Sequence, residues 1–397
     1  MPDDVYIIGA DQHKFGRFPD KDSMDMASEI AIGAVRDAGI TMADIGVLGC
    51  GSLLEPGSGQ RILHQIGATG VPVYNVTNAC ATGATAIRTA YLTLRAGEAD
   101  FGLAVGFEKM GKSGLLGVQP TRDRKVFTPA GRTGNVVASE GVLGTGLMPG
   151  VFAEVGMDYA RQNDGVGFEQ FAKVAEKSHA HSTLNPYSQY RKAFSLDEIM
   201  NAEVIAWPNT LPMCGPTGDG AAAVVLVTGE RLKSLPEETR KRAVKISASV
   251  LTSDRWVDWG MATSDVNTLT REAAAKAYEI SGVDPQDLDL VELHDCFATA
   301  ELVHYDNLGL CAPGEAGKFI DERGPWRDGK IPVNVSGGLV SKGHPLGCTG
   351  VANLVEVTMH LRGEAGDRQI EGAKVGLTHV IGLGSACAIH VLEKVAA

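Results

Sequence analysis

The chain has 397 residues and a mass of 41.7 kDa, which at roughly 150 residues per domain predicts two or three domains. It carries 36 Lys and Arg against 48 Asp and Glu, a formal net charge of −12 at pH 7. The broad electropositive face that holds a nucleic-acid backbone is therefore not expected. A hydrophobic fraction of 44% with 49 Gly is typical of a compact globular chain with many tight turns.

The chain begins with acidic residues and a short apolar stretch at residues 5–10, without the basic segment and long apolar core of a secretory signal. No apolar run approaches the roughly 20 residues of a membrane span. The last three residues, Val395, Ala396 and Ala397, match no targeting or lipidation motif. We therefore expect a cytoplasmic protein without a membrane partner. The 7 Cys form no C-x-x-C pair, which disfavours a disulfide framework and a zinc site.

The sequence repeats itself. Residues 34–45 and 277–288 each predict a helix, a Gly stop, a short turn and an apolar strand. Residues 73–77 and 333–336 each predict a strand, followed by a Gly-rich turn and a long Ala- and Leu-rich helix. A third pair of segments predicts two buried strands, at residues 101–106 and 375–382.

A helix and strand unit that occurs twice, with parallel crossovers, predicts two stacked α/β halves. We assign the first half to residues 1–110 and 216–240, because residues 218–228 predict a buried strand, and the second half to residues 243–397. Residues 111–215 have a different composition and include a helical stretch at 168–180. We interpret this segment as a loop-domain insertion in the first half that covers a site.

Cys80 is a candidate nucleophile, because it lies where the strand at residues 71–76 turns into a helix. A helix N-terminus favours a thiolate by on the order of 1 kcal/mol. This is less than one pKa unit, so a Cys with an ordinary pKa near 8.5 still needs a base. The alternative is a small buried Cys of the core.

His344 follows the equivalent strand of the second repeat, so the internal symmetry predicts that it meets Cys80 where the two halves join. His294 and Cys296 follow another apolar strand, at residues 288–293. The alternatives are a His held by the backbone of its turn and, at Asp295, a helix cap beside a core Cys. We expect no metal site, because no fourth ligand is spaced to match His294 and Cys296.

Three ordered motifs resemble those of the thiolases, and specifically the branch that includes the thiolase domain of sterol carrier protein. They are Asn-Ala-Cys-Ala-Thr-Gly at 78–83, His-Asp-Cys-Phe at 294–297, and Asn-Val-Ser-Gly-Gly with Gly-His-Pro-Leu-Gly at 334–347. The resemblance covers the whole chain. It implies two βαβαβαββ halves in a layered α/β/α/β/α core, a homodimer or dimer of dimers, acyl-CoA and CoA as substrates, and no permanently bound cofactor.

The same resemblance implies a set of roles. Cys80 would accept the acyl group and His344 would be its base, while His344 and His294 would direct N–H groups at the thioester oxygen of the enolate. Most thiolases have Asn at the position of His294. The backbone N–H groups of Cys80 and Leu383 would form a second oxyanion site, and such donors typically contribute about 3 kcal/mol each.

One departure from the family is informative. Many thiolases carry a second catalytic Cys near the C-terminus, where this chain has Ile381. Cys296 is then the expected proton shuttle, and Cys387 is expected in the core. In the implied ping-pong reaction a 3-ketoacyl-CoA acylates Cys80, Cys296 protonates the departing acetyl-CoA or propionyl-CoA enolate, and CoA then takes the acyl group.

Coenzyme A would bring phosphates to an acidic protein, so basic residues of the insertion are candidates for binding them, although exposed solvated charge is the alternative. The candidates are Arg122, Arg124, Lys125, Arg132, Arg191 and Lys192. The motifs specify neither the acyl chain nor the direction of the reaction.

Three other functions remain open. A decarboxylating ketoacyl synthase uses one Cys and two His on the same fold, but would leave Cys296 without a task. A retro-aldolase of steroid side-chain degradation, with a small acyl-CoA-binding partner protein, would lack the nucleophile that Cys80 supplies. A non-catalytic acyl-CoA binder would have no reason to keep all four polar groups at strand ends.

Overall fold

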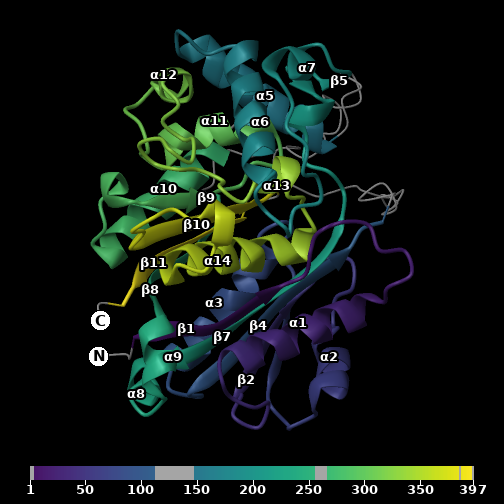
Figure 1. The fold of residues 1–397 in the computed structure, drawn as a ribbon, viewed down its shortest axis with the longest axis vertical. Coiled ribbons are helices and arrows are strands. Elements are labelled where there is room, and N and C mark those ends of the chain that lie inside the picture. The colour runs from purple at the N-terminus through teal and green to yellow at the C-terminus, as the bar shows by residue number, and fades with distance from the viewer. Residues whose placement is uncertain (1–3, 112–146, 255–265, 384–385, 396–397) are drawn as a thin grey trace, which may run out of the picture.

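The computed structural model describes residues 4–111, 147–254, 266–383 and 386–395 (Figure 1). The first segment contains β1 (Val5–Gln12), α1 (Ser23–Asp37), β2 (Val47–Gly51), α2 (Gly59–Ile66), β3 (Val73–Val76), α3 (Thr82–Arg95) and β4 (Phe101–Lys109). The second contains α5 (Leu147–Gln162), α6 (Phe168–Ser182), α7 (Leu196–Met200), β5 (Val204–Ala206), β6 (Asn209–Thr210), β7 (Asp219–Thr228), α8 (Gly229–Leu232), α9 (Glu237–Arg242) and β8 (Val244–Thr252). The remainder contains α10 (Val266–Ser281), β9 (Leu290–Glu292), α11 (Ala298–Asn307), α12 (Ala316–Asp321), α13 (Gly338–Ser341), α14 (Leu346–Arg362), β10 (Val375–Gly382) and β11 (Ala386–Lys394).

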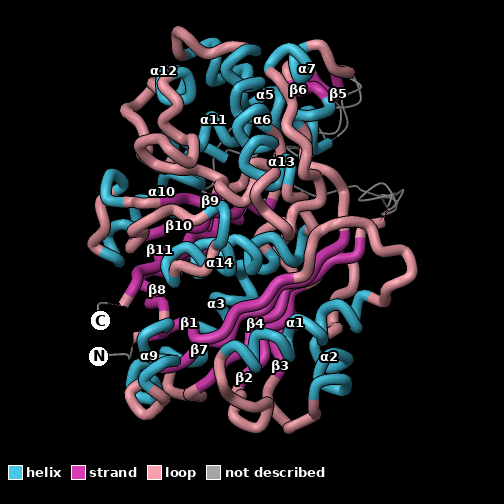
Figure 2. Tube along the Cα trace, in the orientation of Figure 1, coloured by secondary structure: helices cyan, strands magenta, loops and turns pink. Residues whose placement is uncertain are grey.

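Hydrogen bonds join nine strands of the described chain in the order β3-β2-β4-β7-β1-β8-β11-β10-β9. In the first half β2 is parallel to β3 and β4, while β7 is antiparallel to β4 and β1. In the second half β11 is antiparallel to β8 and β10, and β10 is parallel to β9. The halves join through two residue pairs, Tyr6 with Lys245 and Ile7 with Val244. This narrow joint lets each half-sheet face the helices that lie between them (Figure 2).

The middle layer consists of α3 and α14, which pack on each other and contact strands of both half-sheets. Of the residues of α14, all are buried except Met359 and Arg362, as expected for a helix enclosed between two sheets. Helix α1 covers the outer face of the first half-sheet and α10 that of the second (Figure 1). The layered α/β architecture expected from the repeat is therefore present.

Two of the three repeated segments have equivalent structures. α1 and α10 are each followed by a Gly with positive φ, Gly39 at 68° and Gly282 at 74°, which is the αL stop that glycine favours. β4 and β10 are the third pair, and both are buried almost throughout.

The second pair is only partly equivalent. β3 is a strand, whereas residues 333–336 contribute a single bridge between Val333 and Val291. The reason is Asn334, whose φ of 52° ends the extended backbone. Its side chain makes hydrogen bonds where a strand would pair through its backbone. Oδ1 accepts the Leu293 N–H at 2.9 Å, and Nδ2 donates to Glu301 at 2.8 Å.

The described part of the segment that we interpreted as an insertion packs mainly on the second half. Helices α5 and α6 contact α11, and α6 also contacts α12 and α13. They form the upper layer of the molecule in Figure 1, above the strands of the second half-sheet. The division of the chain at residues 110, 216 and 243 stays a prediction.

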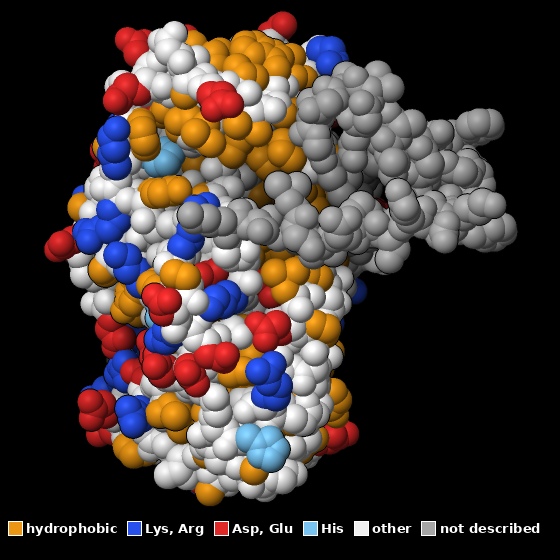
Figure 3. Space-filling model, turned by 90° about the vertical axis from the view of Figure 1, so that its right-hand side faces the viewer, with side chains coloured by type: hydrophobic (Ala, Val, Ile, Leu, Met, Phe, Trp, Pro, Cys, Tyr) orange, Lys and Arg blue, Asp and Glu red, His pale blue; other side chains and the backbone are white. Residues whose placement is uncertain are grey.

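Charged side chains of both signs are intermixed on the face drawn in Figure 3. Hydrophobic side chains gather at its upper end. Among the exposed hydrophobic residues of the described chain, Val204, Ile205, Trp207 and Leu211 belong to the hairpin of β5 and β6 and the turn after it. None of the helices in the described ranges has the length and apolarity that a membrane crossing requires.

Candidate active site

Cys80 lies in the turn between β3 and α3, just before the first turn of the helix. The preceding residue, Ala79, has a φ of 47°, which is strained for a residue with a Cβ. Thr82 stabilises the turn, because its hydroxyl donates to the Ala79 carbonyl and accepts the Asn78 N–H at 2.8 Å. The side chain of Cys80 is 7% exposed, so the turn presents a sulfur that is almost withdrawn from water.

His344 lies in the turn between α13 and α14 and is 8% exposed. Its Nδ1 is 2.7 Å from the Thr349 hydroxyl oxygen, and that hydroxyl lies 3.0 Å from the Pro345 carbonyl. Because a carbonyl only accepts, the single hydroxyl proton goes to Pro345 and the oxygen accepts Nδ1–H. Nε2 then carries the lone pair, and this buried atom has no hydrogen-bond partner among the described residues. His344 is therefore oriented as a base.

Glycines bring the starts of α3 and α14 into backbone contact. A Cβ on Gly83 would lie 2.6 Å from the Gly347 carbonyl oxygen, and one on Gly350 would lie 2.4 Å from the Ala84 nitrogen. No larger residue fits at either position without moving a helix. This contact places the turns of Cys80 and His344 side by side, as the internal symmetry predicted.

His294 follows β9 and adds a second imidazole to this point. The sulfur of Cys80, one ring nitrogen of His294 and one ring nitrogen of His344 all lie within 4.8 Å of one another. The two imidazole rings are nearly perpendicular, at 79°, with centroids 5.2 Å apart. The three residues come from two different halves of the sequence, so the structure brings together the groups that the motifs singled out.

Burial decides the protonation of all three groups. It raises the pKa of the Cys80 thiol to about 12, more than the nearby N–H groups of Leu383 and Cys80 lower it. Burial also lowers the pKa of His344 to about 3. The pKa of His294 lies well below its ordinary value, mainly through burial and also because His344 is close. The resting site is therefore a neutral thiol beside two neutral imidazoles, and the helix N-terminus does not produce a thiolate.

Leu383 lies in the turn between β10 and β11, and its backbone N–H faces the sulfur of Cys80 together with the N–H of Cys80 itself. These are the two backbone donors that the resemblance assigned to an oxyanion site. Residues 384 and 385 of the same turn lie outside the described part of the chain.

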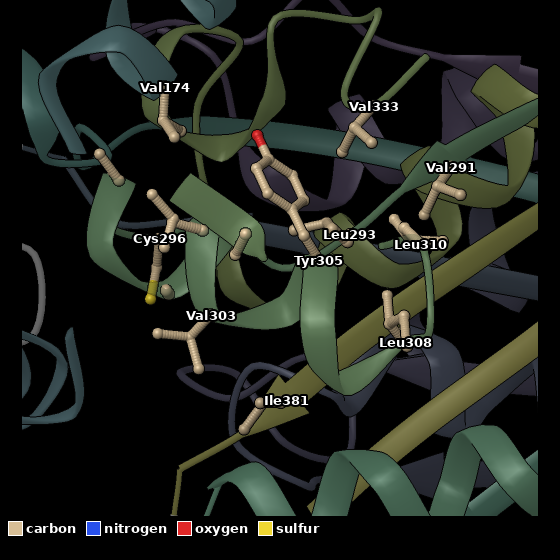
Figure 4. Packing of buried hydrophobic residues seen from close by; sticks show 14 of the residues in the cluster. Val174, Val291, Leu293, Cys296, Val303, Tyr305, Leu308, Leu310, Val333 and Ile381 are labelled. Atoms are coloured by element: carbon tan, nitrogen blue, oxygen red, sulfur yellow. The ribbon is translucent and has the colours of Figure 1, made fainter. Parts of the chain in front are cut away.

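Cys296 is buried, at 8% exposed, in the loop between β9 and α11. Its pKa is raised well above the ordinary value, first by burial and next by Cys80, so the two sulfurs are close enough for their charges to interact. Figure 4 shows Cys296 at one side of the large hydrophobic cluster, which also contains Ile381. Asp295, between His294 and Cys296, caps α13 by accepting the Leu339 N–H at 2.7 Å.

Cys387 lies in β11 opposite Ile381 and is completely buried in the core. Arg191 donates to the Thr183 carbonyl at 2.9 Å, and Lys192 lies over the Phe194 ring. The other four basic candidates, Arg122, Arg124, Lys125 and Arg132, lie outside the described residues.

Three residues that sequence reasoning missed complete the site. Thr349 orients His344, and Phe152 of α5 stacks on Phe297 at 5.6 Å and lies 6.1 Å from the His294 ring. Glu108, at the end of β4, is fully buried and accepts hydrogen bonds from Ser52, Leu53, Leu54 and Gly347. A charged residue at the end of an otherwise apolar strand is the signal that could have revealed Glu108.

Two family models match the chain: "Thiolase, N-terminal domain" at residues 5–201 and "Thiolase C-terminal domain-like" at residues 259–394. The chain is 38% identical to sterol carrier protein 2 of Bos taurus over 401 residues, which cover 98% of this chain and 72% of that protein. It is 34% identical to an acetyl-CoA acetyltransferase of Methanothermobacter thermautotrophicus, over 98% of this chain and all of the other.

Among solved structures, the chain resembles the Ltp2-ChsH2(DUF35) aldolase with a TM-score of 0.79 and 22% identity, over 99% of this chain and 98% of the other. This likeness concerns the fold. The sequence identities over nearly the full length, the two family models and the meeting of Cys80 with His344 agree with one another. The chain belongs to the thiolase family of acyltransferases.

Proposed function

We propose that this protein transfers acyl groups between CoA thioesters through an acyl-Cys80 intermediate, either cleaving a 3-ketoacyl-CoA with CoA or running the reverse Claisen condensation. The observation that carries the proposal is the convergence of Cys80, His294 and His344 within 4.8 Å in a buried site. A nucleophile beside a base whose second nitrogen is held by another group is the arrangement that covalent catalysis requires.

Acylation begins with transfer of the Cys80 proton to His344. Nε2 is free to accept it because Nδ1–H is donated to Thr349. The sulfur attacks the C3 carbonyl of the substrate, and the developing oxyanion receives hydrogen bonds from the N–H groups of Cys80 and Leu383. Almost none of a thiol with a pKa of about 12 is ionised at neutral pH. A base must therefore remove the Cys80 proton for the sulfur to attack.

Breaking the C2–C3 bond leaves an acyl group on Cys80 and the enolate of the shorter acyl-CoA. The enolate oxygen lies against His294 and His344 in this proposal, and Cys296 gives its proton to C2. CoA then attacks the acyl-Cys80 carbonyl after losing its thiol proton to the Cys296 thiolate, and His344 returns its proton as Cys80 leaves. Cys296 is suited to the shuttle because its sulfur is near enough to Cys80 for their charges to interact.

Mass spectrometry tests the intermediate. After incubation of the full chain with acetyl-CoA or acetoacetyl-CoA, we expect an acetyl adduct on the peptide that contains Cys80. Cys80→Ala lacks the adduct, and Cys387→Ala, a buried Cys outside the site, keeps it. An adduct that maps only to Cys296 would contradict the assignment.

The substrate class needs a separate experiment. Thiolysis is measured with short, long, 2-methyl-branched and sterol side-chain 3-ketoacyl-CoAs, and the preferred chain defines the substrate. Cleavage of a 3-hydroxyacyl-CoA without consumption of CoA would instead identify a retro-aldolase. Decarboxylation of a malonyl thioester that continues in Cys296→Ala would identify a decarboxylating condensing enzyme.

A further inference from the structure

We propose that Cys80, His294 and His344 also form a binding site for Zn²⁺, and that zinc bound there blocks acylation of Cys80. Zinc binding does not depend on the proposed function, whereas the inhibition of Cys80 acylation rests on it. From the sequence we expected no metal site, because we considered only His294 with Cys296 as ligands and not a Cys and a His that are far away in the chain.

The spacing of the three groups fits the ion. With Zn–S of about 2.3 Å, Zn–N of about 2.0–2.1 Å and tetrahedral angles, neighbouring ligand atoms are about 3.3–3.6 Å apart. The three ligand atoms are already within 4.8 Å of one another. Side-chain shifts of about 1 Å therefore close the site around an ion.

The ring geometry also agrees with the ion. Two imidazoles that bind one tetrahedral zinc through nitrogen have their centroids about 5 Å apart. The observed centroid distance between His294 and His344 is 5.2 Å. The rings are at 79° to each other, so they approach the common point from different sides without stacking.

An unpaired ring nitrogen also points to a ligand. His344 Nε2 is buried without a hydrogen-bond partner among the described residues, and one ring nitrogen of His294 lies in the same cluster. His344 donates its other N–H to Thr349, as metal-bound histidines usually do toward a neighbouring acceptor.

The donor set selects the metal. One thiolate with two imidazoles favours Zn²⁺ over Mg²⁺ and Ca²⁺, which prefer oxygen ligands. Binding exchanges the Cys80 S–H bond for an S–Zn bond and releases one proton to solvent. A water completes the tetrahedron. With its sulfur and the base both bound to the ion, Cys80 can no longer attack a carbonyl.

Zinc affinity is measured on the full chain by competition with a chromophoric chelator, in the absence of CoA. We expect one ion per chain and, by X-ray absorption, one sulfur and two nitrogen ligands from the protein. Cys80→Ala and His344→Ala weaken binding by 100-fold or more. Cys387→Ala and His390→Gln, a buried Cys and a buried His on β11 outside the cluster, serve as matched controls and keep the wild-type affinity.

Two further measurements distinguish the loss of a zinc ligand from the misfolding of a variant. Alkylation of Cys80 in the wild-type protein with iodoacetamide should abolish binding. Thr349→Val removes only the partner of Nδ1 and should weaken zinc binding 10- to 100-fold, the usual effect of losing such a partner. Unchanged affinity after loss of Cys80, or affinity that depends on Cys214 or Cys296, would overturn the site.

The inhibitory effect has its own readout. Zinc should prevent the acetyl adduct on Cys80, and a chelator should restore it. Binding that requires Cys80 but leaves the adduct unchanged refutes the block. If no adduct forms with or without zinc, the proposed function fails while the metal site stands on its affinity data.

Discussion

The Glu108 carboxylate accepts the backbone N–H of Gly347 at 3.0 Å. This bond ties the end of β4, in the first half of the sequence, to the turn that carries His344 in the second. The same carboxylate holds the loop after β2 through the N–H groups of Leu53 and Leu54. Burial raises the pKa of Glu108, and its hydrogen bonds oppose that rise. Glu108 therefore positions the two halves of the site relative to each other.

We expect Glu108→Gln to lower both stability and turnover. The glutamine amide has one acceptor oxygen where the carboxylate has two, so at least one buried N–H loses its partner, at about 1–3 kcal/mol. A displaced Gly347 also moves the turn that orients His344. Urea unfolding and kcat, measured together, test this.

The matched control for that experiment is Glu279→Gln on the exposed face of α10, which should change stability by less than about 0.5 kcal/mol. An E108Q protein with wild-type stability and kcat would show that the carboxylate does not hold the site together.

Sequence periodicity was sufficient to predict the repeated units, because a helix that ends at Gly39 or Gly282 and the buried strands that follow depend on local signals. It failed at residues 333–336, where Asn334 adopts a positive φ to make tertiary hydrogen bonds. A tertiary contact of this kind leaves no mark in the spacing of apolar residues. The roles of Thr349 and Phe152 could not be predicted for the same reason, because they depend on which elements pack against each other.

The motifs identified the polar residues of the site but not their protonation. A helix N-terminus near Cys80 suggested some thiolate character, and burial reverses that tendency. Desolvation is a property of the assembled layers and cannot be read from residues 78–83 alone.

We expect Cys296→Ala to retain acylation of Cys80 but to lose thiolysis and Claisen condensation by about 100-fold or more, the ordinary scale for a general acid or base. The reason is that only the enolate step and the activation of CoA need its proton. Adduct formation by mass spectrometry and steady-state thiolysis measure the two properties separately.

Cys387→Ala is the control, since this Cys is buried in β11 opposite Ile381. Its turnover should be close to wild type, with at most a loss of stability. The shuttle assignment fails if Cys387→Ala loses thiolysis and Cys296→Ala does not.

Glu292 predicts a pH dependence of stability. It is buried at the end of β9, and burial, with a contribution from Glu356, raises its pKa from 4.5 to about 7. The folded state then holds a proton that the unfolded state has lost between these values. Stability from this group is complete below about pH 4.5 and is lost as the pH rises from there through about 7, at about 1.4 kcal/mol per pH unit.

Glu292→Gln should remove this slope, because an amide does not titrate and can still hydrogen-bond to Ser336. Urea unfolding between pH 4.5 and 8 compares the two proteins. Equal slopes for wild type and variant would mean that Glu292 titrates alike in both states.

His294 differs from the Asn of most thiolases, and its substitution separates catalysis from packing. If its N–H holds the enolate oxygen, His294→Ala should lower kcat and kcat/KM together by roughly 100-fold, because the interaction strengthens only as charge develops. His294→Asn should recover part of the loss, since an amide can position a water donor at the same oxygen. A role limited to packing against Phe152 and His344 would instead lower the melting temperature of both variants and leave the rate per folded molecule nearly unchanged. Turnover and melting temperature measured on the same preparations distinguish these results, and unchanged turnover in a folded Ala variant would remove His294 from the catalytic residues.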